Sequence, residues 1–137
     1  MDERLRTVYG AAVAARFLGP AHAGTPDGEG WVSGAAGRIG VGQLVTIWLR
    51  AGPDGTPVAA RFEAFADPVV IAVADWACER VAAGELGDIV GHRMIEALAV
   101  PTDHSGGALM VEDAFNGARD ALDGARGRCG NEGGSAR

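Results

Sequence analysis

The sequence has no lysine, and its 12 arginines are outnumbered by 18 aspartates and glutamates, giving a formal net charge of −6 over 137 residues. Acidic and basic residues are interleaved along the whole length, so no segment forms the positively charged patch that nucleic acid requires. We therefore expect no nucleic-acid partner.

Cysteine and long apolar runs are also scarce. The two cysteines, Cys78 and Cys129, have neither the spacing of a disulfide framework nor that of a CxxC motif, and the N-terminus lacks a signal-peptide pattern. The longest apolar run, residues 68–74, is far shorter than the ~20 residues of a membrane helix. These absences predict a protein of the reducing cytoplasm with no membrane partner.

The chain length is typical of one domain with its own core. We expect this domain to span residues 1–123. From Gly124 onward the sequence is rich in glycine and has no apolar anchor, so residues 124–137 are predicted to be a disordered tail.

The clearest predicted element is a helix that begins after Asp67 and ends at Gly84. Asp67 is an N-cap residue and Pro68 suits the first helical position. The apolar residues recur at helical spacing and form one broad stripe, which indicates a central helix lying against a sheet; they are Val70, Val73, Ala74, Ala77 and Val81.

The other elements follow from apolar spacing. Helical periodicity predicts helices over 2–18, 86–99 and 107–122. Alternation predicts strands over 43–50 and 58–65, joined by a turn, and a short edge strand is expected near 30–34. Strand 43–50 is apolar on both faces, which is typical of a central strand.

Several short motifs occur in a characteristic order along this pattern. They are the helix from Tyr9 to Gly19-Pro20, the small residues before strand 43–50, Phe62 and Phe65, Leu86, Leu98-Ala99-Val100-Pro101, and Glu112-Asp113-Ala114. From about Tyr9 to Leu122 the chain resembles the IscU/NifU N-terminal family of iron–sulfur cluster assembly scaffolds. The resemblance implies an α+β fold, with an antiparallel sheet of about three strands and helices packed on one face.

In that family three cysteines hold the cluster, and all three are replaced here. Val41-Gly42-Gln43 stands at the first position and Asp67 at the second. The third position falls on Gly106-Gly107 or, with a two-residue gap, on His104-Ser105. Because thiolates hold iron–sulfur clusters and accept sulfur from a donor, the resemblance implies a protein that does not assemble the family's cluster itself.

The remaining polar groups at these positions are Asp67, Gln43 and His104. Such oxygen ligands with one imidazole suit a single zinc or iron ion. Alternatively, Asp67 is only a helix cap and His104 a solvated loop residue. Cys78 is predicted to be a small buried hydrophobe, and Cys129 to be the more exposed and reactive thiol.

We find no catalytic constellation and expect no enzyme. The serines lack a nucleophile elbow, the glycine-rich segment lacks a following Lys-Ser/Thr, and Glu112 and Asp113 are consecutive on a helix, so they point about 100° apart.

Three hypotheses for function follow. The first is a divergent NifU/IscU-like protein linked to iron–sulfur cluster assembly or metalloenzyme maturation through contacts with a cysteine desulfurase, a chaperone or a client metalloenzyme. The second is an accessory subunit of a redox enzyme complex of the hydrogenase type. The third is a protein that binds one metal ion.

Overall fold

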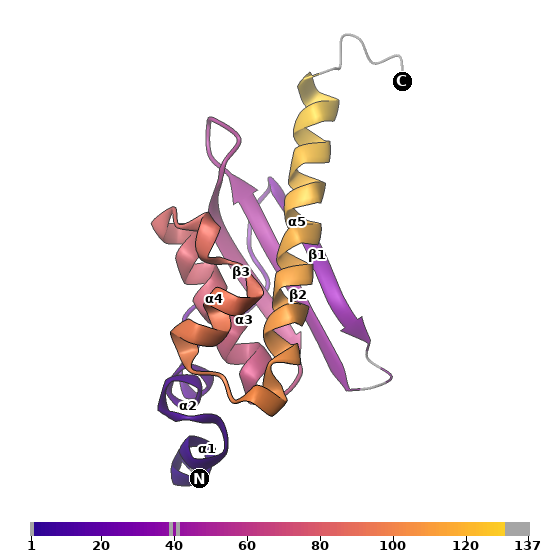
Figure 1. Ribbon diagram of the computed structural model, residues 1–137. Coiled ribbons are helices and arrows are strands. Elements are labelled where there is room, and N and C mark those ends of the chain that lie inside the picture. Colours follow the sequence, from indigo (N-terminus) through magenta and orange to yellow (C-terminus); the bar gives the residue numbers. More distant parts are fainter. Residues whose placement is uncertain (1, 39, 41, 131–137) are drawn as a thin grey trace.

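The computed structural model describes residues 2–38, 40 and 42–130 (Figure 1). In chain order the elements are α1 (Asp2–Tyr9), α2 (Ala11–Leu18), β1 (Trp31–Arg38), β2 (Gln43–Ala51), β3 (Pro57–Phe65), α3 (Pro68–Ala83), the 3-10 helix η2 (Leu86–Asp88), α4 (Gly91–Leu98), the 3-10 helix η3 (Thr102–His104) and α5 (Gly106–Gly130). The predicted α+β class is confirmed.

The three strands form one antiparallel sheet in the order β1-β2-β3. β2 is the middle strand, as the apolar character of both its faces predicted. The expected edge strand near 30–34 is β1, and it is longer than the sequence indicated. In the register of the sheet, Ile47 of β2 lies opposite Gly34 of β1 and Phe62 of β3.

Helices cover one face of this sheet. On β2 the side chains of Val45, Ile47 and Leu49 are at most 1% exposed, and they share their face with Gly34 and Phe62. Helix α5 packs against β1 and β2, and α3 packs against β3, so the two longest helices lie side by side on this face (Figure 1). The predicted one-sided arrangement is confirmed.

Helix α3 is the central helix, with the ends that the sequence predicted. The Asp67 side chain caps its start, Pro68 is its first residue, and Gly84 ends it in the left-handed conformation with φ 80°. Its burial is wider than the predicted stripe, because Val69 and Ala72 are buried as well. The helix is enclosed by α2, β3 and α5 together.

Two predicted helices are each divided in the structure. The helix expected over 2–18 is split into α1 and α2 at Gly10, whose φ of 90° lies outside the helical region and is accessible to glycine. The helix expected over 86–99 is split into η2 and α4. Here the N–H of Gly91 donates to Glu112 of α5 at 2.9 Å, so a contact with another helix fixes the start of α4.

Helix α5 is longer than predicted. The sequence placed its end at Leu122 and a disordered tail from residue 124, whereas the helix continues to Gly130. Residues 125–128 are Ala-Arg-Gly-Arg, and the alanine and the two arginines favour continuation of a helix. Residues 131–137 of the predicted tail lie outside the described residues.

No helix in the described part of the chain is long and apolar enough to cross a membrane.

The packing of α5 on β1 depends on a glycine. A Cβ atom at Gly34 would clash with the backbone N of Ala118 and the backbone O of Ala114, both in α5. The helix backbone therefore lies directly against the strand backbone. Gly117 lies at the same crossing, where an added Cβ would be 3.5 Å from the Cα of Gly34.

We predict that Gly34→Ala lowers the free energy of unfolding by about 1–3 kcal/mol, because the added methyl group must push α5 away from the sheet. Urea denaturation measures the change. Gly87→Ala is the matched control, since a Cβ at Gly87 meets no atom within 4 Å. Equal stability of the two variants would contradict the close helix–strand contact.

Candidate functional site

Two of the predicted site residues meet at the end of the sheet where β3 joins α3. Gln43 is the first residue of β2, and Asp67 stands between β3 and α3. The Gln43 Nε2 group lies 3.5 Å from Asp67 Oδ2, and the backbone N of Asp67 lies 3.4 Å from Gln43 Oε1. The structure thus brings these two positions together in a reciprocal pair at the limit of hydrogen-bond distance.

The Asp67 carboxylate is already engaged by the protein. Its Oδ1 atom accepts hydrogen bonds from the backbone N–H groups of Val69 at 3.0 Å and Val70 at 3.2 Å. Its Oδ2 atom faces Gln43. The N-cap prediction is therefore confirmed, and both carboxylate oxygens have protein partners.

The third predicted position lies beside the same helix start. A Cβ at Gly107 would be 3.1 Å from the side chains of both Val69 and Val70, so the first turn of α5 packs on the first turn of α3. The alternative position, Ser105, donates its hydroxyl to the carbonyl of Thr102 at 3.0 Å. Val41 lies outside the described residues.

His104 faces a different neighbour. Its ring lies against Tyr9 of α1, with the ring centroids 5.0 Å apart and the planes inclined by 55°. Across residues 2–38, 40 and 42–130, no group of three or more histidines, cysteines, aspartates and glutamates could hold a metal ion. What the structure joins at this end of the sheet is one carboxylate and one amide.

The two cysteines differ in what can be said of them. Cys78 is 1% exposed inside α3, and burial, reinforced by the charge of Asp75, raises the pKa of its thiol well above the usual range. It is therefore a protonated, inert thiol, as predicted for a small buried hydrophobe. The side chain of Cys129 lies outside the described part of the structure.

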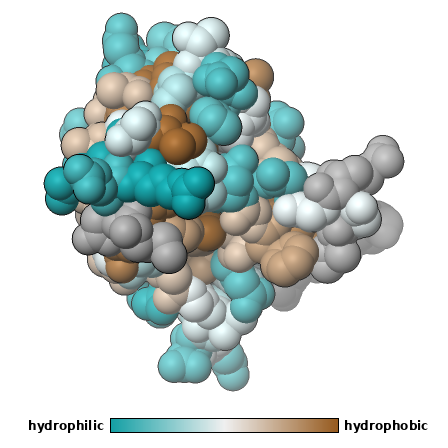
Figure 2. Space-filling view, turned by 90° about the horizontal axis from the view of Figure 1, so that it is seen from below, coloured by the Kyte–Doolittle hydropathy of each residue, from teal (hydrophilic) through white to brown (hydrophobic). Residues whose placement is uncertain are grey.

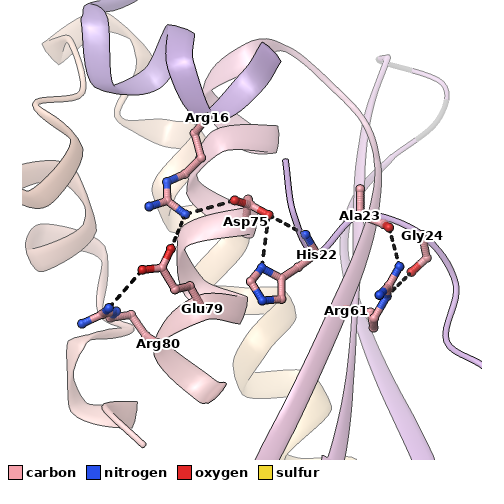
Figure 3. Close-up of polar contacts among 8 residues, drawn as sticks. All are labelled: Arg16, His22, Ala23, Gly24, Arg61, Asp75, Glu79 and Arg80. Atoms are coloured by element: carbon pink, nitrogen blue, oxygen red, sulfur yellow. Dashed lines mark hydrogen bonds and ion pairs between the residues drawn. The ribbon is translucent and has the colours of Figure 1, made fainter. Parts of the chain in front are cut away.

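The sequence analysis missed a cluster of charged residues around Asp75 (Figure 3). Asp75 is 2% exposed, and its carboxylate accepts hydrogen bonds from Arg16 Nη1 at 3.0 Å and from the backbone N–H of His22 at 2.8 Å. The same Arg16 nitrogen donates to Glu79 at 2.7 Å, and this bond lowers the pKa of Glu79. The cluster fastens α2 and the segment after it to α3.

One signal for this cluster was present in the sequence. Asp75 is the only charged residue between Pro68 and Cys78, within an otherwise apolar helix. A carboxylate in such a place needs partners when buried. The partners themselves, Arg16 and His22, are more than 50 positions away in the sequence and become neighbours only through the fold.

We predict that Asp67→Ala lowers the free energy of unfolding by about 0.5–2 kcal/mol through loss of the cap, measured by urea denaturation. Asp67→Asn is the matched control. It keeps an oxygen that can accept the Val69 and Val70 N–H groups, and asparagine caps about as well as aspartate. If Asn were as damaging as Ala, charge rather than capping would dominate the role of Asp67.

Comparison with known proteins adds no relative of this chain. No protein-family model matches the sequence, and no curated protein matches it. The resemblance to the IscU/NifU family therefore stays a prediction, argued from the sequence motifs and from the geometry of the site.

Proposed function

We propose that this chain is a divergent NifU/IscU-like protein that serves iron–sulfur cluster assembly or metalloenzyme maturation through contacts with other proteins, without assembling a cluster itself. A cysteine desulfurase, a chaperone or a client metalloenzyme is the kind of partner this role requires. The role calls for binding surfaces rather than a catalytic group.

The observation that carries this proposal is the convergence of segments at the start of α3. The strand start at Gln43, the junction at Asp67 and the first turn of α5 at Gly107 adjoin one another through the contacts described above. By the resemblance, Asp67 and Gly107 correspond to two of the family's cluster-ligand positions, and Gln43 follows two residues after the third, Val41. The described side chains there offer an amide and a carboxylate, which are poor ligands for an iron–sulfur cluster.

A role in protein contacts is supported by the surface beside this junction. Phe65, two residues before Asp67, is 63% exposed. Together with Leu44 and Thr46 it lines a hollow of about 350 Å³ on the sheet. Exposed aromatic residues are enriched at protein interfaces. Seen from below, hydrophobic spots on this end of the molecule are interspersed with hydrophilic residues (Figure 2).

We predict that protein purified without oxygen from its own host contains neither iron with acid-labile sulfide nor a stoichiometric zinc or iron ion, and that components of cluster assembly co-purify with it. Metal analysis, sulfide analysis and mass spectrometry of the bound proteins are the measurements.

Phe65→Ala should reduce the amount of co-purifying protein while leaving the free energy of unfolding nearly unchanged, because the side chain is largely exposed.

Val58→Ala is the matched control, since Val58 is also exposed, at 47%, but lies at the other end of β3.

Iron and sulfide in near-equal amounts would contradict the proposal and indicate a working scaffold. A single metal ion lost in Asp67→Ala would favour a mononuclear site. A fixed complex with one oxidoreductase would favour an accessory subunit.

A second prediction tests whether the site keeps the family's arrangement. We expect the triple variant Val41→Cys, Asp67→Cys, Gly107→Cys to take up an iron–sulfur cluster when iron and sulfide are supplied without oxygen, because thiolates are then restored at all three positions. The unaltered protein should take up none. Visible absorption and the iron-to-sulfide ratio report the cluster.

The same triple variant with serine in place of each cysteine is the control for altered packing. A further variant with Ser105→Cys in place of Gly107→Cys tests the alternative third position. Gly107 is the expected one, because it packs on the first turn of α3. If neither cysteine variant takes up a cluster, the three segments do not share the family's ligand geometry.

A further inference from the structure

The two outer edges of the sheet differ. The edge of β3 is covered by residues 22–24: Phe62 donates its backbone N–H to the carbonyl of His22 at 3.1 Å, and Gly24 donates to the carbonyl of Phe62 at 2.8 Å. The guanidinium of Arg61 binds two carbonyls of the same segment. Strand β1 forms the opposite edge, and no segment among the described residues pairs with its outer side (Figure 1).

Strand β1 therefore presents, over eight residues, backbone groups that nothing in the described part of the chain pairs. In an antiparallel pair every second residue of an edge strand points its N–H and C=O groups away from the neighbouring strand. The usual protections of an edge are missing in β1: it has no proline, its only charged residue is Arg38 at its end, and its eight pairs with β2 run without a bulge. The residues over 33–37 are serine, alanine and glycine, whose side chains leave the backbone accessible.

Helix α5 places negative charge beside this edge. Its residue Gly117 lies over Gly34 of β1. Asp113 and Asp120 are four residues before and three residues after Gly117, so they share its helix face and lie beside β1. Both are exposed, and neither carboxylate has a hydrogen-bond or ion-pair partner among the described side chains. A strand added to β1 therefore runs next to two carboxylates with free acceptor capacity.

We propose that β1 accepts an extended segment of a partner protein as a fourth strand of the sheet, with arginine or lysine side chains facing Asp113 and Asp120. Main-chain hydrogen bonds supply the affinity, and every second side chain of the added strand faces α5 and supplies the selectivity. The inference goes beyond the proposed function and does not depend on it, because it rests on the edge of the sheet and the charges of α5 alone.

A second copy of this chain is a less suitable occupant of the edge. Pairing of β1 with itself about a two-fold axis places the α5 helices of both copies on the same face of one continuous sheet, beside the shared edge. The carboxylates of Asp113 and Asp120 in the two copies then face each other as like charges, which is destabilising. A basic strand meets the same carboxylates with opposite charge.

The test uses the purified full chain and a synthetic eight-residue peptide in which arginine alternates with valine, titrated by calorimetry at about 50 mM salt, where charge contacts are weakly screened. Alternation places all the arginines on one side of the extended peptide. We expect binding to slow the hydrogen exchange of the outward-facing amides of β1 at least about tenfold, measured by NMR. The same peptide with every backbone nitrogen methylated cannot donate to β1 and should bind at least about tenfold more weakly.

The variant Asp113→Asn/Asp120→Asn should weaken binding of the arginine peptide by about threefold to tenfold, since exposed ion pairs contribute modestly. Its free energy of unfolding should be nearly unchanged, because both side chains are exposed. Glu85→Gln/Glu96→Gln is the matched control: it removes the same charge from exposed positions outside α5 and should leave binding within about twofold of the unaltered protein. Citrulline in place of arginine in the peptide should abolish the difference between the two variants.

Equal binding of the methylated and unmethylated peptides would overturn the proposal, since no strand would then be added. Equal loss in the two double variants would also overturn it, because binding would then respond to net charge alone. A dimer of the unliganded chain with the β1 amides already protected would assign the edge to a second copy instead. None of these measurements involves iron, sulfide or a host protein, so failure here is distinguishable from failure of the proposed role in cluster assembly.

Discussion

The capping of α3 by Asp67 is the interaction on which the arrangement of the other elements depends. It fixes the point at which the chain leaves β3 and α3 begins. Helix α3 in turn is the common packing partner of β3, α2, α4 and α5. Because the cap also faces Gln43 of β2, one side chain links the middle strand, the edge strand and the central helix.

The elements that could be predicted from the sequence are those whose signal is local. Strand β2 is apolar on both faces, and its buried residues alternate along it, while α3 has a cap, a proline and a terminal glycine in the expected places. Strand β1 was foreseen only in part, because Ala35, Ala36 and Gly37 in its second half have weak strand propensity. These small residues form a strand because α5 lies directly on them, which is a tertiary effect.

The same distinction separates the two groups of polar residues. Gln43 and Asp67 could be placed together because the resemblance supplied their positions, and their contact in the fold agrees with that placement. The cluster around Asp75 joins α2, α3 and the segment that contains His22, and no local pattern specifies such a contact. A single acidic residue in an apolar helix indicates that a partner exists without identifying it.

Asp67 stands where the resembled family has a cysteine ligand, and as a carboxylate it differs from a thiolate in more than the absence of sulfur. A helix start presents unpaired backbone N–H groups, and these favour an anion. In a cluster-binding protein a thiolate or the cofactor can supply that negative charge. Here the chain supplies it through its own carboxylate, which accepts the N–H groups of Val69 and Val70. The N–H groups at the start of α3 are thereby paired within the chain itself, and the two strands and the helix that meet at this end of the sheet are held together by one side chain.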